Sequence, residues 1–190
     1  MRYVRDMMSL RVFVALLLTA TAGEAAAQTM AFGCPAAGTT FIFDSGTKVV
    51  SRGQDGVDCK MDTVDGAPFK MRALLIPNPG PDGSDTSTFL ATLKPERLWP
   101  LSVGKKVEAR LTTPQGNWSY ILQVAEYEQR SGPRGALVDT FVIELNEQGP
   151  DDFRSRSRWW ISPAEKYMIR FDATNSKQVS NRAVVTEIKR

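Results

Sequence analysis

Residues Val103–Gln129 read VGKKVEARLTTPQGNWSYILQVAEYEQ, and this stretch decides the fold class of the chain. Apolar and polar residues alternate in two runs, 103–113 and 118–129, on either side of the turn-forming letters PQGN. A period of two is typical of strands that bury one face. If Thr113 lies opposite Trp118, the apolar residues of both runs share one face; they are Val107, Ala109, Leu111, Tyr120, Leu122 and Val124. The stretch therefore predicts an antiparallel β-hairpin.

Short extended runs separated by turn residues continue on both sides of this hairpin. The upstream runs cover 39–44, 47–51, 57–62 and 69–76, and the downstream runs cover 136–146, 153–161, 166–173 and 183–189. The letters DSG, QDG and VDG separate the upstream runs, and in such turns glycine takes a positive φ without steric cost. A helical turn is expected only at 94–99. We predict a mainly β protein of about eight to ten strands with little helix. Its strands form a curved antiparallel meander, as a half-barrel or a partly open barrel or sandwich.

Residues 1–27 have the features of a secretory signal peptide. A cationic start with three arginines precedes the apolar run Val12–Ala20, and the small residues Ala25–Ala27 suit a signal peptidase. The apolar run is far shorter than the roughly 20 residues that span a bilayer as a helix. We therefore expect cleavage near Gln28, no transmembrane anchor, and a periplasmic or secreted protein.

Cleavage after residue 27 leaves 163 of the 190 residues, which is enough for a single β domain at 28–190. The proline- and glycine-rich loop 77–85 is expected to separate two halves of this domain. The full chain has 24 basic and 21 acidic residues. This near balance gives no support for nucleic acid as a partner.

The chain has two cysteines, Cys34 and Cys59, and no histidine. Export would bring both thiols into an oxidising compartment, so we expect a disulfide between them. Two thiols without histidine are a poor ligand set for zinc. We expect no metal site and no cofactor.

The segment Phe41–Thr47, FIFDSGT, is similar to the aspartic-protease signature. That chemistry needs a second aspartate close to Asp44, and no second Asp-Ser-Gly or Asp-Thr-Gly occurs. The same letters are typical of a three-residue hairpin loop with Gly46 in a left-handed conformation. The absence of histidine also excludes Ser-His-Asp and Cys-His catalysis. We expect a non-catalytic protein, with an aspartyl-type hydrolase that uses Asp44 in a homodimer as an alternative.

Three arginines, Arg154, Arg156 and Arg158, alternate with serines and lead into Trp159-Trp160. In a strand, the three guanidinium groups and Trp160 share one face, which suits a phosphate, a carboxylate or a glycan. The other interpretation is a solvated strand face with Arg156 opposite Glu144, while Trp159 packs in the core. Binding of an anionic glycan or phosphate by these arginines is thus a second alternative function.

Several short motifs follow one another in an order found in a group of exported proteobacterial proteins. They are Cys34-Pro35, Gly38–Phe41, Leu98–Lys105, Gly135–Phe141 and Trp159–Pro163. On these motifs the chain resembles the DUF3108-like periplasmic proteins over most of residues 34–173. It departs from the usual phrases of the group at Leu137, Val138 and Trp160. The resemblance implies a curved antiparallel sheet and no established reaction.

The sequence therefore favours a non-catalytic envelope protein that binds an apolar or amphipathic ligand, or an envelope partner. We expect the ligand on the concave face of the sheet, beside Val107, Leu122, Tyr120 and Trp160. The predicted ligand-binding residues are Arg154, Arg156, Arg158, Trp160 and Tyr120.

Overall fold

The computed structural model describes residues 28–80 and 83–190, and the predicted signal peptide lies outside the described residues. The strands are β1 (Thr29–Met30), β2 (Thr40–Phe43), β3 (Lys48–Asp55), β4 (Asp58–Thr63), β5 (Pro68–Arg72), β6 (Ile76–Asn78), β7 (Leu101–Ser102), β8 (Lys106–Thr113), β9 (Gly116–Ser131), β10 (Leu137–Gln148), β11 (Arg154–Ser162), β12 (Tyr167–Asn175) and β13 (Ser180–Lys189). The helical elements are the α-helix α1 (Ser87–Leu93) and the 3₁₀ helices η1 (Pro95–Leu98) and η2 (Pro133–Gly135). In this part of the chain, no helix has both the length and the apolarity to cross a membrane.

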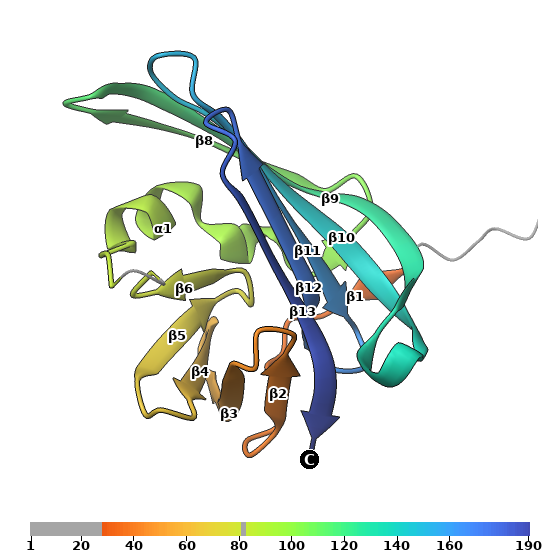
Figure 1. The fold of residues 1–190 in the computed structure, drawn as a ribbon. Coiled ribbons are helices and arrows are strands. Elements are labelled where there is room, and N and C mark those ends of the chain that lie inside the picture. Colours follow the sequence, from red (N-terminus) through yellow and green to blue (C-terminus); the bar gives the residue numbers. More distant parts are fainter. Residues whose placement is uncertain (1–27, 81–82) are drawn as a thin grey trace, which may run out of the picture.

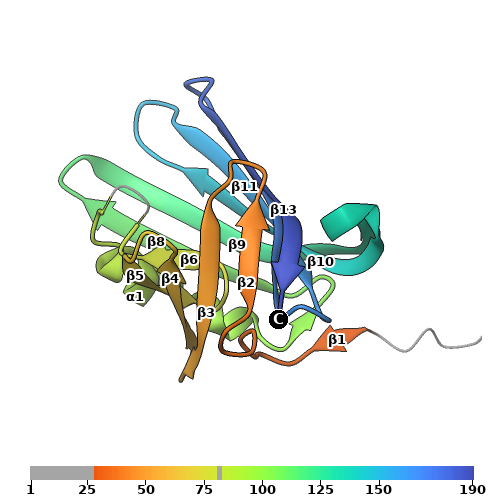
Figure 2. The ribbon, with the colours of Figure 1, turned by 60° about the horizontal axis from the view of Figure 1, so that its bottom comes forward.

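Eleven of the strands form one antiparallel sheet in the order β6-β5-β4-β3-β2-β13-β12-β11-β10-β9-β8 (Figure 1, Figure 2). The sheet consists of two meanders, β2–β6 and β8–β13. The C-terminal strand β13 joins them, because it pairs with β2 on one side and with β12 on the other. The edge strands β6 and β8 do not pair with each other in the described chain, so the sheet is open. The predicted class, a curved antiparallel sheet with little helix, is confirmed.

The hairpin of β8 and β9 is confirmed, but its register differs by two residues from the prediction. Thr113 lies opposite Gly116 and not Trp118, so the chain reverses within Pro114 and Gln115. Gly116 has a φ of +132°, a backbone conformation that residues with a side chain rarely adopt. A shift of two residues keeps every side chain on its face, so the predicted apolar face is retained.

The pair of β10 and β11 also differs by two residues, because Glu144 lies opposite Arg158 and not Arg156. Strand β10 continues to Gln148, through part of the region predicted as a loop. Glu147 is therefore a strand residue, and it lies opposite Ser155.

The run 69–76, predicted as one strand, forms two strands. The chain reverses between β5 and β6 at Ala73 and Leu74, which are buried and have φ values of +54° and +64°. No glycine, proline or asparagine marks this turn in the sequence. The Trp99 indole Nε1 donates a hydrogen bond to the Ala73 carbonyl at 3.2 Å, which ties the turn to the segment after η1.

The helical turn predicted at 94–99 corresponds to η1, whereas α1 was not predicted. Helix α1 buries Leu90 and Leu93, which lie three residues apart on one helical face. Before the helix, the Asp85 carboxylate accepts a hydrogen bond from the Ser87 amide at 2.8 Å. The predicted loop 77–85 also begins later than expected, because Pro77 and Asn78 belong to β6.

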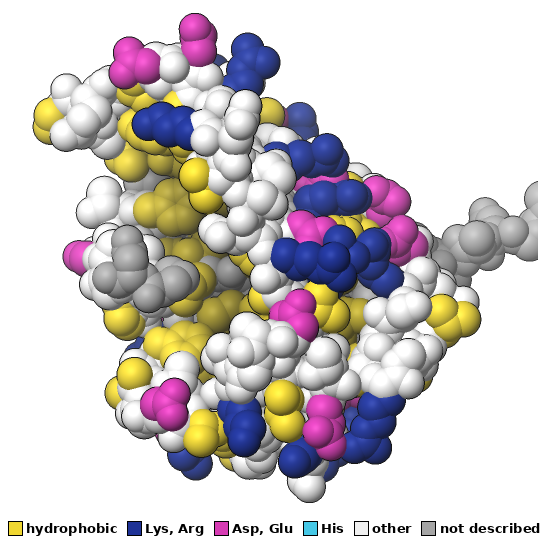
Figure 3. All heavy atoms as spheres, viewed as in Figure 1, with side chains coloured by type: hydrophobic (Ala, Val, Ile, Leu, Met, Phe, Trp, Pro, Cys, Tyr) yellow, Lys and Arg dark blue, Asp and Glu magenta, His cyan; other side chains and the backbone are white. Residues whose placement is uncertain are grey.

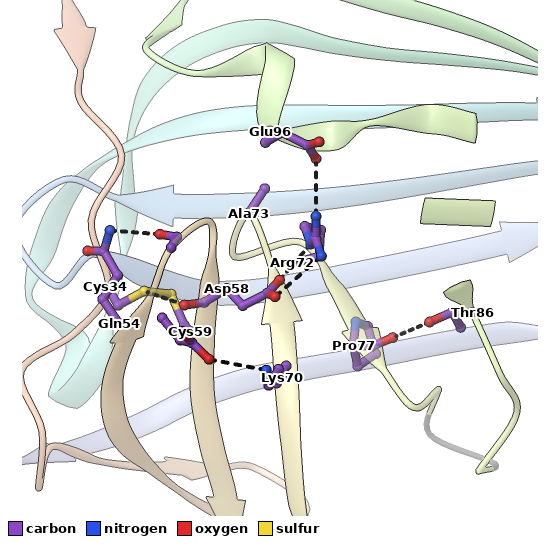
Figure 4. Close-up of polar contacts among 12 residues, drawn as sticks. Cys34, Gln54, Asp58, Cys59, Lys70, Arg72, Ala73, Pro77, Thr86 and Glu96 are labelled. Atoms are coloured by element: carbon purple, nitrogen blue, oxygen red, sulfur yellow. Dashed lines mark hydrogen bonds and ion pairs between the residues drawn. A yellow bond between two sulfur atoms is a disulfide. The ribbon is translucent and has the colours of Figure 1, made fainter. Parts of the chain in front are cut away.

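The predicted disulfide between Cys34 and Cys59 is confirmed, with the two Cα atoms 5.5 Å apart (Figure 4). It connects the segment before β2 to β4. Cys59 is fully buried in the cluster that contains Phe41, Met61 and Met71. The cross-link therefore holds the N-terminal segment against the core of the first meander.

The sheet has two different faces, which we call concave and convex. The concave face carries the two large hydrophobic clusters, with Leu122, Leu145 and Trp159 in one and Met71 and Tyr167 in the other. The convex face carries a small buried cluster of Val142, Trp160 and Ile169. Figure 3 shows hydrophobic side chains gathered in a hollow on the left and charged side chains of both signs over β10–β12 on the right.

Candidate functional site

An open groove with a volume of about 860 Å³ lies on the concave face, between the two meanders. Strands β2–β6 and the start of α1 supply one wall, and β10–β13 supply the other. Its aromatic lining residues are Phe43, Phe69, Phe89, Trp159, Tyr167 and Phe171. Its aliphatic ones include Val49, Met71, Leu75, Ile76, Leu145 and Met168. The volume falls within the range of roughly 300–1,000 Å³ that is usual for small-molecule sites.

Strand alternation explains the second wall. Leu145 and Trp159 occupy alternate positions of β10 and β11 whose neighbours in sequence face the other side. Trp159 packs against Phe171 of β12, with ring centroids 5.3 Å apart. Tyr167 is fully buried and stacks on Phe41 at 4.0 Å, and its burial raises the pKa of the phenol. These rings give the groove an ordered apolar wall.

Polar contacts fix the first wall (Figure 4). Arg72 of β5 donates a hydrogen bond from Nε to Asp58 of β4 at 2.6 Å, and its guanidinium lies 4.0 Å from the Glu96 carboxylate of η1. The Thr86 hydroxyl donates a hydrogen bond to the Pro77 carbonyl at 3.0 Å, which connects the segment before α1 to β6. The β4–β6 wall is thus connected to both helical elements that follow it.

Glu147 is the one charged residue among the described residues that line the groove. It lies on β10 between Tyr120 of β9 and Ser155 of β11. No basic nitrogen of residues 28–80 or 83–190 lies within ion-pair distance of its carboxylate. Burial raises the pKa of Glu147, and the Ser155 hydroxyl partly offsets this effect. A partly buried carboxylate without a basic partner in the described chain is therefore the charged feature of the groove lining.

Sequence reasoning missed Glu147 because the letters that follow it, QGPDD, indicated a loop. The signal that marks it is the alternation itself. Ile143 and Leu145 are buried on the concave face, and the same period of two carries Glu147 to that face.

The convex face has a different organisation around Trp160. Three guanidinium groups lie over its ring, with Arg130, Arg158 and Arg170 at 4.4, 5.1 and 4.9 Å from the centroid. The Trp160 Nε1 donates a hydrogen bond to Glu128 at 2.7 Å. This hydrogen bond, together with Arg130, lowers the pKa of Glu128.

The arginines predicted as ligand-binding residues lie on this convex face, and two of them are paired with acidic residues. Arg156 forms an ion pair with the buried Glu144. Arg158 donates to Glu126 at 2.8 Å, and its Nε lies 2.9 Å from Glu144. The Nε–H does not make a hydrogen bond there, so this second contact is electrostatic. Much of the positive charge of the three arginines on β11 is therefore compensated by acidic residues of the same chain.

The five predicted ligand-binding residues do not form one site. Tyr120 lies on the concave face with Val107 and Leu122, where it packs against Phe89 at 5.0 Å. Trp160 lies on the convex face. The pairing with β10 explains this: Tyr120 lies opposite Glu147 and Trp160 lies opposite Val142. Positions 147 and 142 are an odd number of residues apart on the same strand, so they face opposite sides of the sheet.

A smaller depression of about 270 Å³ lies at the ends of β10–β12. Arg154 and Arg156 line it together with Glu147, and the other lining residues are polar: Asn146, Gln148, Ser155, Thr174, Asn175 and Ser176. Arg154 has no ion-pair partner among the described residues. Glu147 thus borders both the apolar groove and this polar depression.

Asp44 lies in the exposed turn between β2 and β3. Its Oδ1 accepts a hydrogen bond from the Val184 amide at 3.1 Å. Gly46 has a φ of +82°, as expected for a three-residue hairpin loop. The contacts of Asp44 are those of a residue that joins β2 to β13.

Comparison with known proteins assigns no family. No family model matches the chain, and no curated protein matches it. Among solved structures, the hypothetical lipoprotein YmcC from Escherichia coli K12 is similar, with a TM-score of 0.47 and 10% sequence identity. The similarity covers 78% of this chain and 82% of that chain. The predicted resemblance to the DUF3108-like proteins is not confirmed.

Proposed function

We propose that the protein is an exported, non-catalytic β-sheet protein that binds an apolar or amphipathic small molecule in the concave groove. The observation that carries this proposal is the groove itself, an open hollow of about 860 Å³ whose described lining contains one charged residue. Apolar surface that leaves water on binding contributes roughly 25 cal/mol per Å². An open apolar hollow of this kind is typical of a binding site.

Two features support a location outside the cytoplasm. Residues 1–27 have the pattern of a signal peptide, and the Cys34–Cys59 disulfide is typical of an oxidising compartment. We therefore propose a periplasmic or secreted protein. Because β13 joins both meanders into one sheet, we also propose that residues 28–190 form a single domain.

The groove is a better-supported site than the two alternatives. The Asp44 carboxylate is engaged with a backbone amide of β13, and Arg156 and Arg158 are engaged with Glu144. The groove, by contrast, has an apolar lining that is open to solvent.

A neutral fluorescent probe, N-phenyl-1-naphthylamine, tests the proposal directly. We expect the wild-type protein to bind it with increased emission. The matched variants are Ala183→Trp and Arg182→Trp, because Ala183 lines the groove whereas Arg182 is exposed on the opposite face of the same strand. Filling the groove with an indole should weaken probe binding about tenfold or more, which corresponds to roughly 1.4 kcal/mol.

Arg182→Trp should bind the probe like the wild type, and thermal unfolding should show that both variants are folded. Failure of the folded wild type to bind the probe would exclude the groove as an apolar site. Equal probe affinities of the two variants would also contradict the proposal, because binding would then not depend on the groove.

A further inference from the structure

We propose that the groove selects cationic amphiphiles over anionic ones, because the Glu147 carboxylate binds the amine or ammonium group of the ligand and repels an anionic headgroup. The ligand class is an apolar body that carries one positive charge. This inference rests on the proposed function of the groove and specifies the charge of its ligand.

Glu147 lies on the concave face of β10, at one end of the groove. It follows Leu145 by two residues, and side chains two residues apart in a strand share a face. Leu145 and Glu147 are the positions of β10 that line the groove, and the strand ends one residue later, at Gln148. Trp159 lies opposite Ile143, four residues before Glu147, which is roughly 13 Å along the strand. A charged group bound at Glu147 therefore leaves the attached apolar body over Leu145 and Trp159.

No basic residue shares the groove with Glu147. The described lining contains neither lysine nor arginine, and Glu147 forms no ion pair within residues 28–80 and 83–190. Arg154 and Arg156 are neighbours in β11, but they flank Ser155, which lies opposite Glu147, so they face the convex side. The charge that a ligand meets in the groove lining is therefore negative.

The residues beside Glu147 do not compensate its charge. Tyr120 of β9 and Ser155 of β11 lie opposite it in the sheet, and neither carries a positive charge. Burial raises the pKa of Glu147, and burial together with the charge of Glu147 raises the pKa of Tyr120. A partly buried carboxylate at this position lacks the partner that buried charges usually have. A ligand cation supplies this partner, whereas a ligand anion adds a second charge of the same sign.

Displacement of N-phenyl-1-naphthylamine by three amphiphiles with the same chain tests the selection. They are dodecyltrimethylammonium, dodecyl maltoside and dodecyl sulfate, each used below its micelle concentration, with near-ultraviolet circular dichroism to show that the protein stays folded. At pH 8, we expect the wild type to bind dodecyltrimethylammonium about tenfold more tightly than dodecyl sulfate, or more. Dodecyl maltoside has no charge and shows whether the chain binds at all.

Glu147→Gln keeps the size of the side chain and removes its charge. In this variant, the ratio of the affinities for dodecyltrimethylammonium and dodecyl sulfate should fall about tenfold. Glu126→Gln makes the same charge change on the convex face, where Glu126 pairs with Arg158, and should leave the ratio at its wild-type value. Because both ligands have the same chain, a purely structural effect of a variant on the groove would cancel in the ratio.

A pH titration of the wild type gives a second test that needs no variant. Both headgroups keep their charge between pH 4.5 and 8, so the ratio should fall as the pH decreases through the raised pKa of Glu147 and the carboxylate takes up a proton. The other titratable groups among the described lining residues and the residues opposite Glu147 are the phenols of Tyr167 and Tyr120, whose raised pKa values keep them uncharged in this range. The ratio of Glu147→Gln should stay nearly constant over the same interval.

The outcomes separate this inference from the proposed function. If the probe and dodecyl maltoside bind but the wild type, Glu147→Gln and Glu126→Gln have the same ratio, Glu147 does not select the headgroup and only the proposed function stands. Equal affinities of the wild type for the cation and the anion at pH 8 would also overturn the selection. If neither the probe nor any amphiphile binds the folded wild type, the proposed function fails, and this inference fails with it.

Discussion

The two faces of strands β9–β12 differ in whether their charged residues have partners of opposite charge. On the convex face, acidic partners pair with Arg156 and Arg158, and Glu128 accepts a hydrogen bond from Trp160. On the concave face, the surroundings are apolar and Glu147 has no basic partner in the described chain. The arginine-rich face is thus largely neutralised by acidic residues of the same sheet. The candidate site lies on the other face, where the one charged lining residue has no basic partner in the described chain.

The contrast extends to the ionisation of two carboxyl groups. The hydrogen bond from Trp160 lowers the pKa of Glu128, whereas burial raises the pKa of Glu147. The first carboxylate is stabilised by its neighbours and the second is destabilised by them. We therefore expect substitutions on the convex face to affect stability and substitutions in the groove to affect binding.

The largest effect is expected for Trp160→Ala. The side chain is 1% exposed, and its loss removes a large buried volume together with the hydrogen bond to Glu128. The free energy of unfolding should fall by about 3–5 kcal/mol, measured by urea denaturation. At low temperature, where the variant is folded, its affinity for the neutral probe should equal that of the wild type. A loss of affinity as large as that of Ala183→Trp would contradict the separation of the two faces.

The second-largest effect on the free energy of unfolding is expected for loss of the disulfide in the first meander. Replacing both cysteines, Cys34→Ser with Cys59→Ser, releases a loop with a sequence separation of 25 residues and should cost roughly 3–4 kcal/mol. Because Cys59 belongs to the cluster behind the groove wall, amide exchange should accelerate first in β4 and β5. Equal acceleration in β9–β12 would show that the disulfide does not act locally.

A smaller effect is expected for Glu144→Gln on the convex face. The carboxylate is buried and contacts both Arg156 and Arg158. Its neutralisation should cost about 1–3 kcal/mol of unfolding free energy. Because part of the interaction is exposed and screened by salt, the difference from the wild type should shrink at high ionic strength. An unchanged difference in 1 M salt would indicate a packing effect instead.

The smallest effects are expected in the pH dependence of stability, where the contributions of Glu147 and Glu128 should have opposite signs. The pKa of Glu147 is raised above its ordinary value of 4.5, so the folded state binds this proton more tightly than the unfolded state. Wild-type stability should therefore fall, relative to Glu147→Gln, as the pH rises from about 4.5 through the raised pKa. For Glu128, whose pKa is lowered, the carboxylate stabilises the fold above its ordinary pKa of 4.5, and this contribution is lost as the pH falls through the lowered value. Urea denaturation of both glutamine variants from about pH 2.5 to 8 tests the two signs, and equal signs would contradict the contrast.

Much of the fold could be predicted from sequence because alternation and turn chemistry are local. The hairpin of β8 and β9, the turn at Gly46 and the disulfide follow from such signals. Register could not be fixed, because a slip of two residues keeps the same face buried. The turn at Ala73 and Leu74 lacks turn residues, and it is held by Trp99 from a distant segment.

The candidate site was less predictable, because it depends on which side chains of neighbouring strands lie on the same face of the sheet. Tyr120 pairs with Glu147 and Trp160 pairs with Val142, and these two positions of β10 face opposite sides of the sheet. Placing both residues correctly therefore requires the register of three strands, which the sequence alone does not fix. Trp159 was correctly placed in the core, and Glu147 follows from alternation once β10 is known to reach Gln148.

Quenching of tryptophan fluorescence by a dodecyl amphiphile brominated near its chain end tests the central claim most directly. Trp159 lines the groove, and its neighbour Trp160 is buried on the other face. If the chain occupies the groove, Trp159→Phe should lose much of the quenching seen in the wild type, whereas Trp160→Phe should retain it. Quenching that survives Trp159→Phe and disappears in Trp160→Phe, or no saturable quenching at all, would contradict the account.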